Sequence, residues 1–282
     1  MLAQKVDEII RSVANLRPMP ANVTRILREI ENPHVSIDML SQLIGLDQAL
    51  VALVLQMSNS ASLGYSRTIS TTYEAVMHLG LSRLKSILLT SSATGLMNRS
   101  LGGYRLGAGE LWHHSLVTGV VSEWLAQALR YSSSEEAYVS GLLHDIGKLL
   151  LDQFVLNNYQ TIVAHVQQYK LPLWQVEEKL IGIDHAKVGG LIAERWDFPI
   201  VLVEAIRCHH APSLAVNNQR LPAIINLANY FAEDYQLPNS GLSSSDLHPD
   251  ALTILKIDAA GVEKLRAGLK TSGRLSSFSN SG

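Results

Sequence analysis

Apolar residues recur every three or four positions along most of the chain, which is the spacing of one face of an α-helix. Ser36 and Asp47 each precede such a run, and both are residue types that favour the N-cap of a helix. No segment alternates apolar and polar residues in the manner of a convincing strand. The pattern therefore predicts an all-α protein. The first clear run comprises Val23, Ile26, Leu27 and Ile30.

Glycines interrupt the helical pattern at two places. Gly80 is predicted to end a short helix just after Leu79, and residues 81–96 restart the pattern. Four glycines within residues 100–109 make that stretch the predicted connection between two lobes. Seven further helices are predicted beyond it, near residues 110–130, 135–151, 157–169, 173–180, 185–196, 199–211 and 221–235.

These interruptions predict the organisation of the chain. We expect an N-terminal helical lobe over residues 1–100 and a second helical lobe over residues 101–240. From Asn239 the chain turns to Ser, Gly and Asn, and we expect residues 241–282 to form a partly disordered extension. Within it, one short helix is predicted near residues 250–267 and a disordered tail from Thr271.

The composition excludes several classes of protein. Hydrophobic residues make up 47% of the 282 residues and charged residues 17%, so the chain is globular with ample core. The formal net charge is -2 and the chain has no basic run, so the sequence offers no positively charged surface for nucleic acid. The N-terminus lacks the layout of a signal peptide, residues 48–66 are too polar for a membrane span, and the single cysteine excludes an intramolecular disulfide. We expect a cytoplasmic protein without nucleic-acid or membrane partners.

A histidine and an aspartate, His144 and Asp145, stand side by side in an otherwise apolar run. A carboxylate buried there needs a cation, a metal or several donors, because burying it alone is very costly. Imidazole and carboxylate together suit Zn, Mn or Fe. Lys148 would share the helical face of His144 and could meet an anionic substrate oxygen. The alternative is a structural Asp–Lys pair beside a packed histidine.

Other histidines face inward on separate predicted helices. His185 shares a face with Gly189, where adjacent glycines would let another helix approach closely. One of His209 and His210 must share the apolar face of the helix that they end, and His114 lies on the inward side of its own helix. A single histidine of this kind is more often a packed core residue. Several around one His-Asp pair favour a site.

These motifs resemble the HDOD domain, a relative of the HD-domain metal-dependent phosphohydrolases and of HD-GYP cyclic-di-GMP phosphodiesterases. The resemblance covers roughly residues 10–240 and implies an HD-like helical core with an additional N-terminal helical lobe. The similar motifs are Leu16-Arg-Pro-Met-Pro20, Leu40-Ser-Gln-Leu-Ile44, Asn59-Ser-Ala61, Ala75-Val-Met-His-Leu-Gly80, Trp112-His-His-Ser115, His144-Asp-Ile-Gly-Lys148, His185 with Gly189, Trp196, and His209-His210.

Carried over residue by residue, the resemblance implies a set of metal ligands. Asp145 would bridge two metals, and His210 would lie nearby. Active relatives have an aspartate where this chain has Asn229, whose neutral oxygen can coordinate a metal but cannot act as a carboxylate base. Ala211-Pro212-Ser213 stands in place of a Gly-Tyr-Pro segment, which argues against the cyclic-di-GMP phosphodiesterase class. The implied ligands are His114, His144, Asp145, His185, His209 and Asn229.

The resemblance leaves two main functions open. The first is a regulatory output protein of signal transduction with a degenerate or ligand-sensing site, whose partner is a signalling protein or a small nucleotide-like ligand. The second is a metal-dependent phosphohydrolase acting on a nucleotide-type phosphomonoester or phosphodiester, in which one or two ions of Fe, Mn, Zn or Mg activate a water.

In that enzyme, Asp145, Lys148 and His210 would be the catalytic residues. Lys148 would neutralise the phosphate and His210 would protonate the leaving oxygen. A scaffold with an empty pocket is a third alternative. We favour the regulatory protein, because Asn229 lacks the charge of the aspartate that it replaces.

Overall fold

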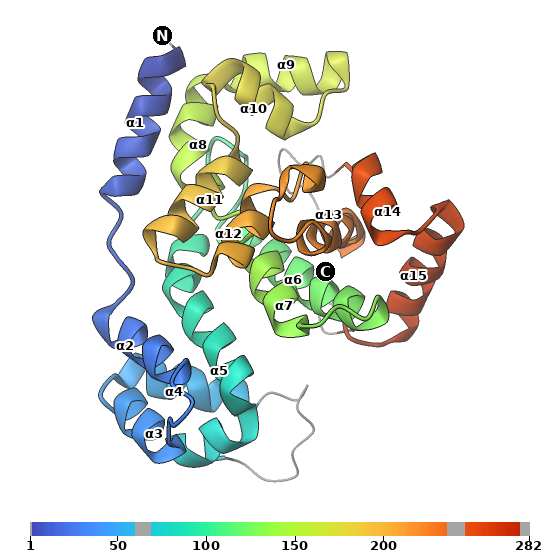
Figure 1. Ribbon diagram of the computed structural model, residues 1–282. Coiled ribbons are helices and arrows are strands. Elements are labelled where there is room, and N and C mark those ends of the chain that lie inside the picture. Colours follow the sequence, from blue (N-terminus) through green and yellow to red (C-terminus); the bar gives the residue numbers. More distant parts are fainter. Residues whose placement is uncertain (1, 60–68, 236–245, 277–282) are drawn as a thin grey trace. The chain divides into compact units, whose positions relative to one another are not determined.

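The computed structural model describes residues 2–59, 69–235 and 246–276 (Figure 1). Over these residues the chain is helical, and the β-structure is limited to one isolated bridge between Leu101 and Leu106. The prediction of an all-α protein is therefore confirmed. None of the described helices combines the length and the apolar character needed to cross a membrane.

Two compact units divide the chain. One consists of residues 17–95, and the other combines residues 1–16 with residues 96–282. The second unit is thus discontinuous in sequence. The chain crosses between the units after Leu16 and again after Gly95.

The unit of residues 17–95 contains α2 (Ala21–Ile30), α3 (Ile37–Gly45), α4 (Gln48–Ser58) and most of α5 (Thr72–Met97). Both predicted caps are present, since Ser36 accepts a hydrogen bond from the Met39 amide and Asp47 accepts bonds at the start of α4. The predicted interruption at Gly80 is confirmed as a kink inside α5, where this glycine adopts a φ of 72°. That conformation favours glycine because it has no Cβ.

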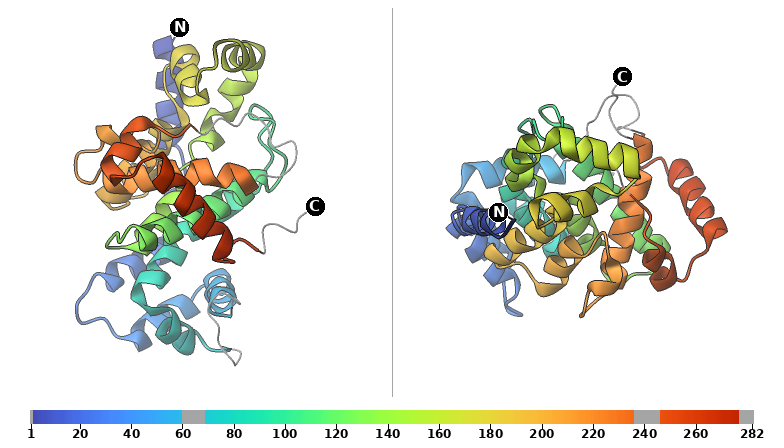
Figure 2. Two further views of the ribbon diagram at one scale, coloured as in Figure 1. Left: turned by 90° about the vertical axis from the view of Figure 1, so that its right-hand side faces the viewer. Right: turned by 90° about the horizontal axis from the view of Figure 1, so that it is seen from above.

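The other unit contains the remaining helices. Its buried centre is α13, which packs against α6, α7, α12 and α14, while α15 lies beside α6 (Figure 2). These elements are α1 (Leu2–Ala14), α6 (Glu110–Ala128), α7 (Ser134–Leu143), α8 (Lys148–Asn157), α9 (Tyr159–Tyr169), α10 (Leu173–Ile181), α11 (His185–Arg195), α12 (Ile200–Arg207), α13 (Arg220–Ala232), α14 (Pro249–Leu255) and α15 (Ala259–Thr271).

The glycine-rich residues 100–109, the predicted connection between two lobes, are closely packed. They belong wholly to the second unit and pack against α8. The Gly103 amide donates a hydrogen bond to Asp152 Oδ1 at 2.8 Å, and a Cβ on Gly103 would lie 2.2 Å from the Asp152 carbonyl oxygen. Tyr104 is fully buried. Gly103 therefore allows this loop to pack closely against α8.

Two predicted helices are each divided in the structure. The predicted helix over residues 135–151 is wrong as a single element, because α7 ends at Leu143 and α8 begins at Lys148. The intervening turn contains the His-Asp pair. The helix predicted near residues 250–267 consists of α14 and α15, separated at Lys256, which adopts a left-handed conformation.

The first residues of the predicted disordered tail are ordered. Thr271 ends α15, Arg274 donates a hydrogen bond to Gln127 at 2.7 Å, and Leu275 is buried. A tail from Thr271 is therefore wrong for residues 271–276, whose contacts with the helical unit order them. The rest of the predicted tail, residues 277–282, lies outside the described residues.

Candidate functional site

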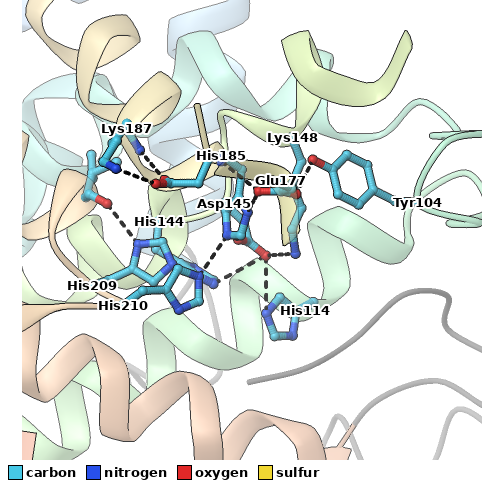
Figure 3. A network of polar contacts seen from close by, with 12 residues as sticks. Tyr104, His114, His144, Asp145, Lys148, Glu177, His185, Lys187, His209 and His210 are labelled. Atoms are coloured by element: carbon cyan, nitrogen blue, oxygen red, sulfur yellow. Dashed lines mark hydrogen bonds and ion pairs between the residues drawn. The ribbon is translucent and has the colours of Figure 1, made fainter. Parts of the chain in front are cut away.

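Four of the predicted site residues converge on the carboxylate of Asp145 (Figure 3). Its Oδ2 lies 3.6 Å from His114 Nε2, 3.4 Å from His144 Nε2 and 2.6 Å from Lys148 Nζ. Its Oδ1 lies 3.2 Å from His185 Nε2. Asp145 is only 1% exposed, so these neighbours replace the water that its charge would otherwise need.

Different elements supply these groups. His114 lies on α6, His144 and Asp145 in the turn between α7 and α8, and His185 at the start of α11. His209 and His210 follow α12, while Asn229 lies on the buried helix α13. The site therefore depends on how the helices of this unit pack together.

Local sequence explains how α11 brings His185 so close to the turn. Asp184 caps α11 by accepting a hydrogen bond from the Lys187 amide at 2.8 Å, which places His185 at the first helical position. Gly147 in the turn faces the backbone of α11, and a Cβ there would lie 2.0 Å from the His185 carbonyl oxygen. A Cβ on Gly189 would lie 2.9 Å from Ile206 of α12. The close approach predicted for this glycine is confirmed.

Backbone carbonyl groups orient two of the histidines. His144 Nδ1 lies 2.7 Å from the Gly141 carbonyl oxygen, and His209 Nδ1 lies 2.8 Å from that of Ile206. A carbonyl oxygen can only accept, so Nδ1 carries the hydrogen and each Nε2 presents a lone pair. Both Nε2 atoms are buried and form no hydrogen bond within the described residues. Metal-binding histidines have this arrangement.

Two sets of nitrogen and oxygen atoms are close enough to share an ion. His114, His144 and Asp145 form one set, and His185, His209 and His210 form the other, with all ligand atoms of a set within 4.8 Å of one another. The Nε2 atoms of His185 and His210 are 2.9 Å apart. Two imidazoles with a carboxylate, and three imidazoles, are both donor sets that suit first-row divalent metals.

The electrostatics of the cluster favour ligand binding by most of its members. Burial opposes the charge of Asp145, but His144 and Lys148 outweigh it and hold the pKa of the carboxyl well below its usual range. Burial lowers the pKa of His114 to about 3 and that of His209 and His210 well below the usual value. These histidines are therefore neutral at pH 7, which is the form that binds a metal.

His185 behaves differently from its neighbours. Burial favours its neutral form, but the Glu177 carboxylate outweighs burial and raises the pKa of His185 to about 9. Glu177 is fully buried and accepts hydrogen bonds from His185 Nδ1 at 2.6 Å and from the Tyr104 hydroxyl at 2.7 Å. Glu177 lies between Leu173 and Ile181 on an apolar helical face, and a carboxylate at such a position is a sequence signal for a functional residue. Nothing in the sequence marks Tyr104 in this way.

Asn229 lies beside the set of His114. It is 6% exposed, its buried Oδ1 meets no described donor in good hydrogen-bond geometry, and its side chain lies close enough to His114 to oppose the lowering of the pKa of that histidine. An oxygen without a partner at this position fits a further metal ligand. An asparagine offers an oxygen there without the charge of a carboxylate.

Comparisons with known proteins agree with the fold and the motifs. The HDOD domain family model matches residues 16–212. An uncharacterized protein of Treponema pallidum is 28% identical over 210 residues, which cover 74% of this chain and 39% of that protein. The chain thus spans well under half the length of this relative.

Solved structures of similar proteins cover nearly the whole chain. An HDOD domain protein of unknown function from Geobacter sulfurreducens is 25% identical, with a TM-score of 0.76 over 98% of this chain and 97% of that one. A protein from Shewanella amazonensis, provisionally described as a phosphohydrolase, is also 25% identical, with a TM-score of 0.71 over 96% and 97% of the two chains. Since the family model matches more than half of the chain, this protein belongs to the HDOD family.

Proposed function

We propose that this chain is a regulatory output protein of signal transduction whose His/Asp cluster binds one or two divalent ions and senses a phosphorylated, nucleotide-like ligand. The observation that supports it best is the pair of ligand sets around Asp145, in which the buried Nε2 atoms of His144 and His209 form no hydrogen bond to described residues. Fe, Mn, Zn and Mg are the candidate ions. A signalling protein partner and a cytoplasmic location stay predictions.

Each of the two ligand sets would hold one ion. His114, His144 and Asp145 would hold one ion together with the Asn229 oxygen, and His185 and His209 would hold the other. His210 belongs to the second set by position. A bound divalent ion supplies positive charge and polarises a phosphoryl oxygen.

The more exposed side of the cluster is where a phosphorylated ligand would enter. The side chains of His114 and Lys148 are 16% and 13% exposed, whereas those of His144 and Asp145 are almost fully buried. Asp145 holds the Lys148 ammonium at 2.6 Å, and an ammonium has three hydrogens to donate. Lys148 would therefore bind a phosphate oxygen while it stays paired with Asp145.

Two features favour sensing over catalysis. Asn229 cannot accept a proton from water in the way that the aspartate of active relatives can. The lowered pKa of His210 leaves it neutral at pH 7, which disfavours the role of proton donor that the sequence suggested for it. A ligand that binds one state of the protein better than another shifts the balance between them without turnover.

A metal-dependent phosphohydrolase is the second candidate. The convergence of five imidazoles with Asp145 and Lys148 supports it, as does the fold shared with the Shewanella amazonensis protein. In this enzyme Asp145, Lys148 and His210 would be the catalytic residues. The two candidates share the metal site and differ in turnover.

An assay for turnover distinguishes the two candidates. Protein purified without a metal-affinity step is loaded with Mn²⁺ or Fe²⁺ and offered nucleotides, cyclic dinucleotides and a generic phosphodiester. We expect binding of a nucleotide without hydrolysis. Hydrolysis that disappears in Asp145→Ala, with the variant still folded, would establish the phosphohydrolase instead.

A further inference from the structure

A buried carboxylate outside both ligand sets is hydrogen-bonded to one of the histidines. Glu177 of α10 is fully buried, and its Oε2 accepts hydrogen bonds from both the backbone amide of His185 at 2.9 Å and the ring Nδ1 at 2.6 Å. These two bonds fix the ring relative to its own backbone. They turn His185 Nε2 toward Asp145 Oδ1, which lies 3.2 Å away.

Tyr104 completes the surroundings of this carboxylate. Its hydroxyl donates to Glu177 Oε1 at 2.7 Å, and its ring lies 5.6 Å from Lys148 Nζ. Glu177 thus accepts three hydrogen bonds and donates none. This is the pattern of an ionised carboxylate, which can only accept. Figure 3 shows Glu177 between Tyr104 and His185, on the far side of the imidazole from Asp145.

His185 differs in this respect from the other oriented histidines. Neutral carbonyl groups hold His144 and His209, whereas an ionised carboxylate holds His185. A carboxylate that accepts from the remote nitrogen of a ligating histidine fixes the tautomer and makes the ring a stronger ligand. We propose that Glu177, held by Tyr104, is a positioning residue that makes His185 the anchor of the three-histidine ion site. This inference rests on the proposed metal site.

The alternative is that Glu177 only stabilises the fold. A matched control is available in Glu204 of α12, another buried carboxylate, which accepts hydrogen bonds from the Val216 amide and from the amide and side chain of Asn217. These contacts order a loop and involve no member of the two ligand sets. Glu177→Ala and Glu204→Ala each remove a buried carboxylate that accepts three hydrogen bonds.

The amide variant separates ring orientation from charge. In Glu177→Gln the amide oxygen can take the place of Oε2 and accept both bonds from His185. The amide nitrogen then faces the Tyr104 hydroxyl, which can accept as well as donate. Orientation is kept while the charge is lost, so Gln should rescue part of what Ala loses.

The experiment is a calorimetric titration of metal-free protein with Co²⁺, together with the visible absorption of the bound ion, which reports its ligands. We expect Glu177→Ala to lower the Co²⁺ affinity, corrected for the protons that binding displaces, about 10- to 100-fold and to change the absorption bands. Glu177→Gln should show a smaller loss, and Glu204→Ala should leave affinity and bands unchanged.

Three results would contradict these expectations. Unchanged affinity in Glu177→Ala, beside a wild type that binds Co²⁺, overturns this inference alone. An equal loss of affinity in Glu204→Ala overturns it too, because the effect would then follow from stability. A wild type that binds no ion overturns the proposed metal site, and this inference with it.

Discussion

At the scale of single residues, protonation of His185 opposes metal binding. Burial favours the neutral ring, but Glu177 outweighs it and raises the pKa of His185 to about 9. The metal-free site therefore carries a proton at neutral pH that an ion must displace, and affinity should rise about tenfold per pH unit up to about pH 9. Calorimetry at pH 7 in buffers of different ionisation enthalpy should detect release of about one proton. No release would contradict the expected charge of His185.

The same shift affects the stability of the metal-free protein. The pKa of His185 is higher in the folded chain than the ordinary value of 6.5, so its protonation stabilises the fold. That contribution is fully present below pH 6.5 and is lost as the pH rises through about 9. A free energy of unfolding that stays constant between these values would be evidence against the shift.

Asn229→Asp restores a carboxylate at a buried position. An anionic oxygen beside a divalent cation should raise Mn²⁺ affinity about tenfold. The metal-free variant should be less stable than the wild type, because the new charge is buried near Asp145. Thermal unfolding with and without Mn²⁺ should thus show a lower melting temperature without metal and a larger shift on its addition.

Asn226 provides the control on the same helix. It is also buried, but its side chain bonds to the backbone at Asp246 and His248. Asn226→Asp should lower stability without enlarging the shift caused by Mn²⁺. A similar response of the two variants would mean that position 229 has no special relation to the ion.

At the scale of elements, the contact between the turn at Gly147 and α11 sets the geometry of the site. Gly147 has an ordinary helical conformation, so alanine would not strain its backbone. Its Cβ would nevertheless lie 2.0 Å from the His185 carbonyl oxygen and 2.6 Å from the Gly189 amide. Gly147→Ala should therefore cost more than about 3 kcal/mol in denaturant unfolding, at or above the upper end of overpacking.

Gly102→Ala is the control for this substitution. No heavy atom lies within 4 Å of a Cβ on Gly102, so alanine has room there and its φ is not in the left-handed region. Its effect should stay within about 1 kcal/mol of the wild type. Equal unfolding free energies for the two variants would contradict the close approach of the turn to α11.

The helices themselves could largely be predicted, because their signals are local. Helical spacing and the caps Ser36, Asp47 and Asp184 depend on residues a few positions apart, and all three caps are present. The break between α7 and α8 could not be predicted in this way. It depends on the backbone of α11 lying against Gly147, which the sequence within residues 135–151 does not express.

In the candidate site, too, local motifs could be predicted and contacts between distant segments could not. Its histidines and Asp145 could be predicted from their motifs, although their distances to one another come from the packing of separate helices. The role of Glu177 could not be predicted, because its partner Tyr104 is 73 positions away, in a loop that the sequence marked only as a connection between two lobes.

At the scale of the whole molecule, the unit that contains the site depends on the first residues of the chain. Helix α1 packs against α8, α10 and α11, and Lys5 donates a hydrogen bond to the Leu180 carbonyl oxygen. Ile9 is fully buried, whereas Ile10 is 47% exposed. Ile9→Ala should cost about 2–5 kcal/mol in urea unfolding, and Ile10→Ala less than about 1 kcal/mol. Equal costs would contradict the docking of α1.

The central claim is that this HDOD protein binds divalent ions at the two ligand sets around Asp145. Anomalous X-ray scattering from crystals grown with Mn²⁺ tests it most directly, because it locates the ions themselves. We predict a peak among His114, His144 and Asp145, a peak among His185, His209 and His210, or both. Crystals that show no anomalous peak at either set, at an Mn²⁺ concentration well above that of the protein, would contradict the claim.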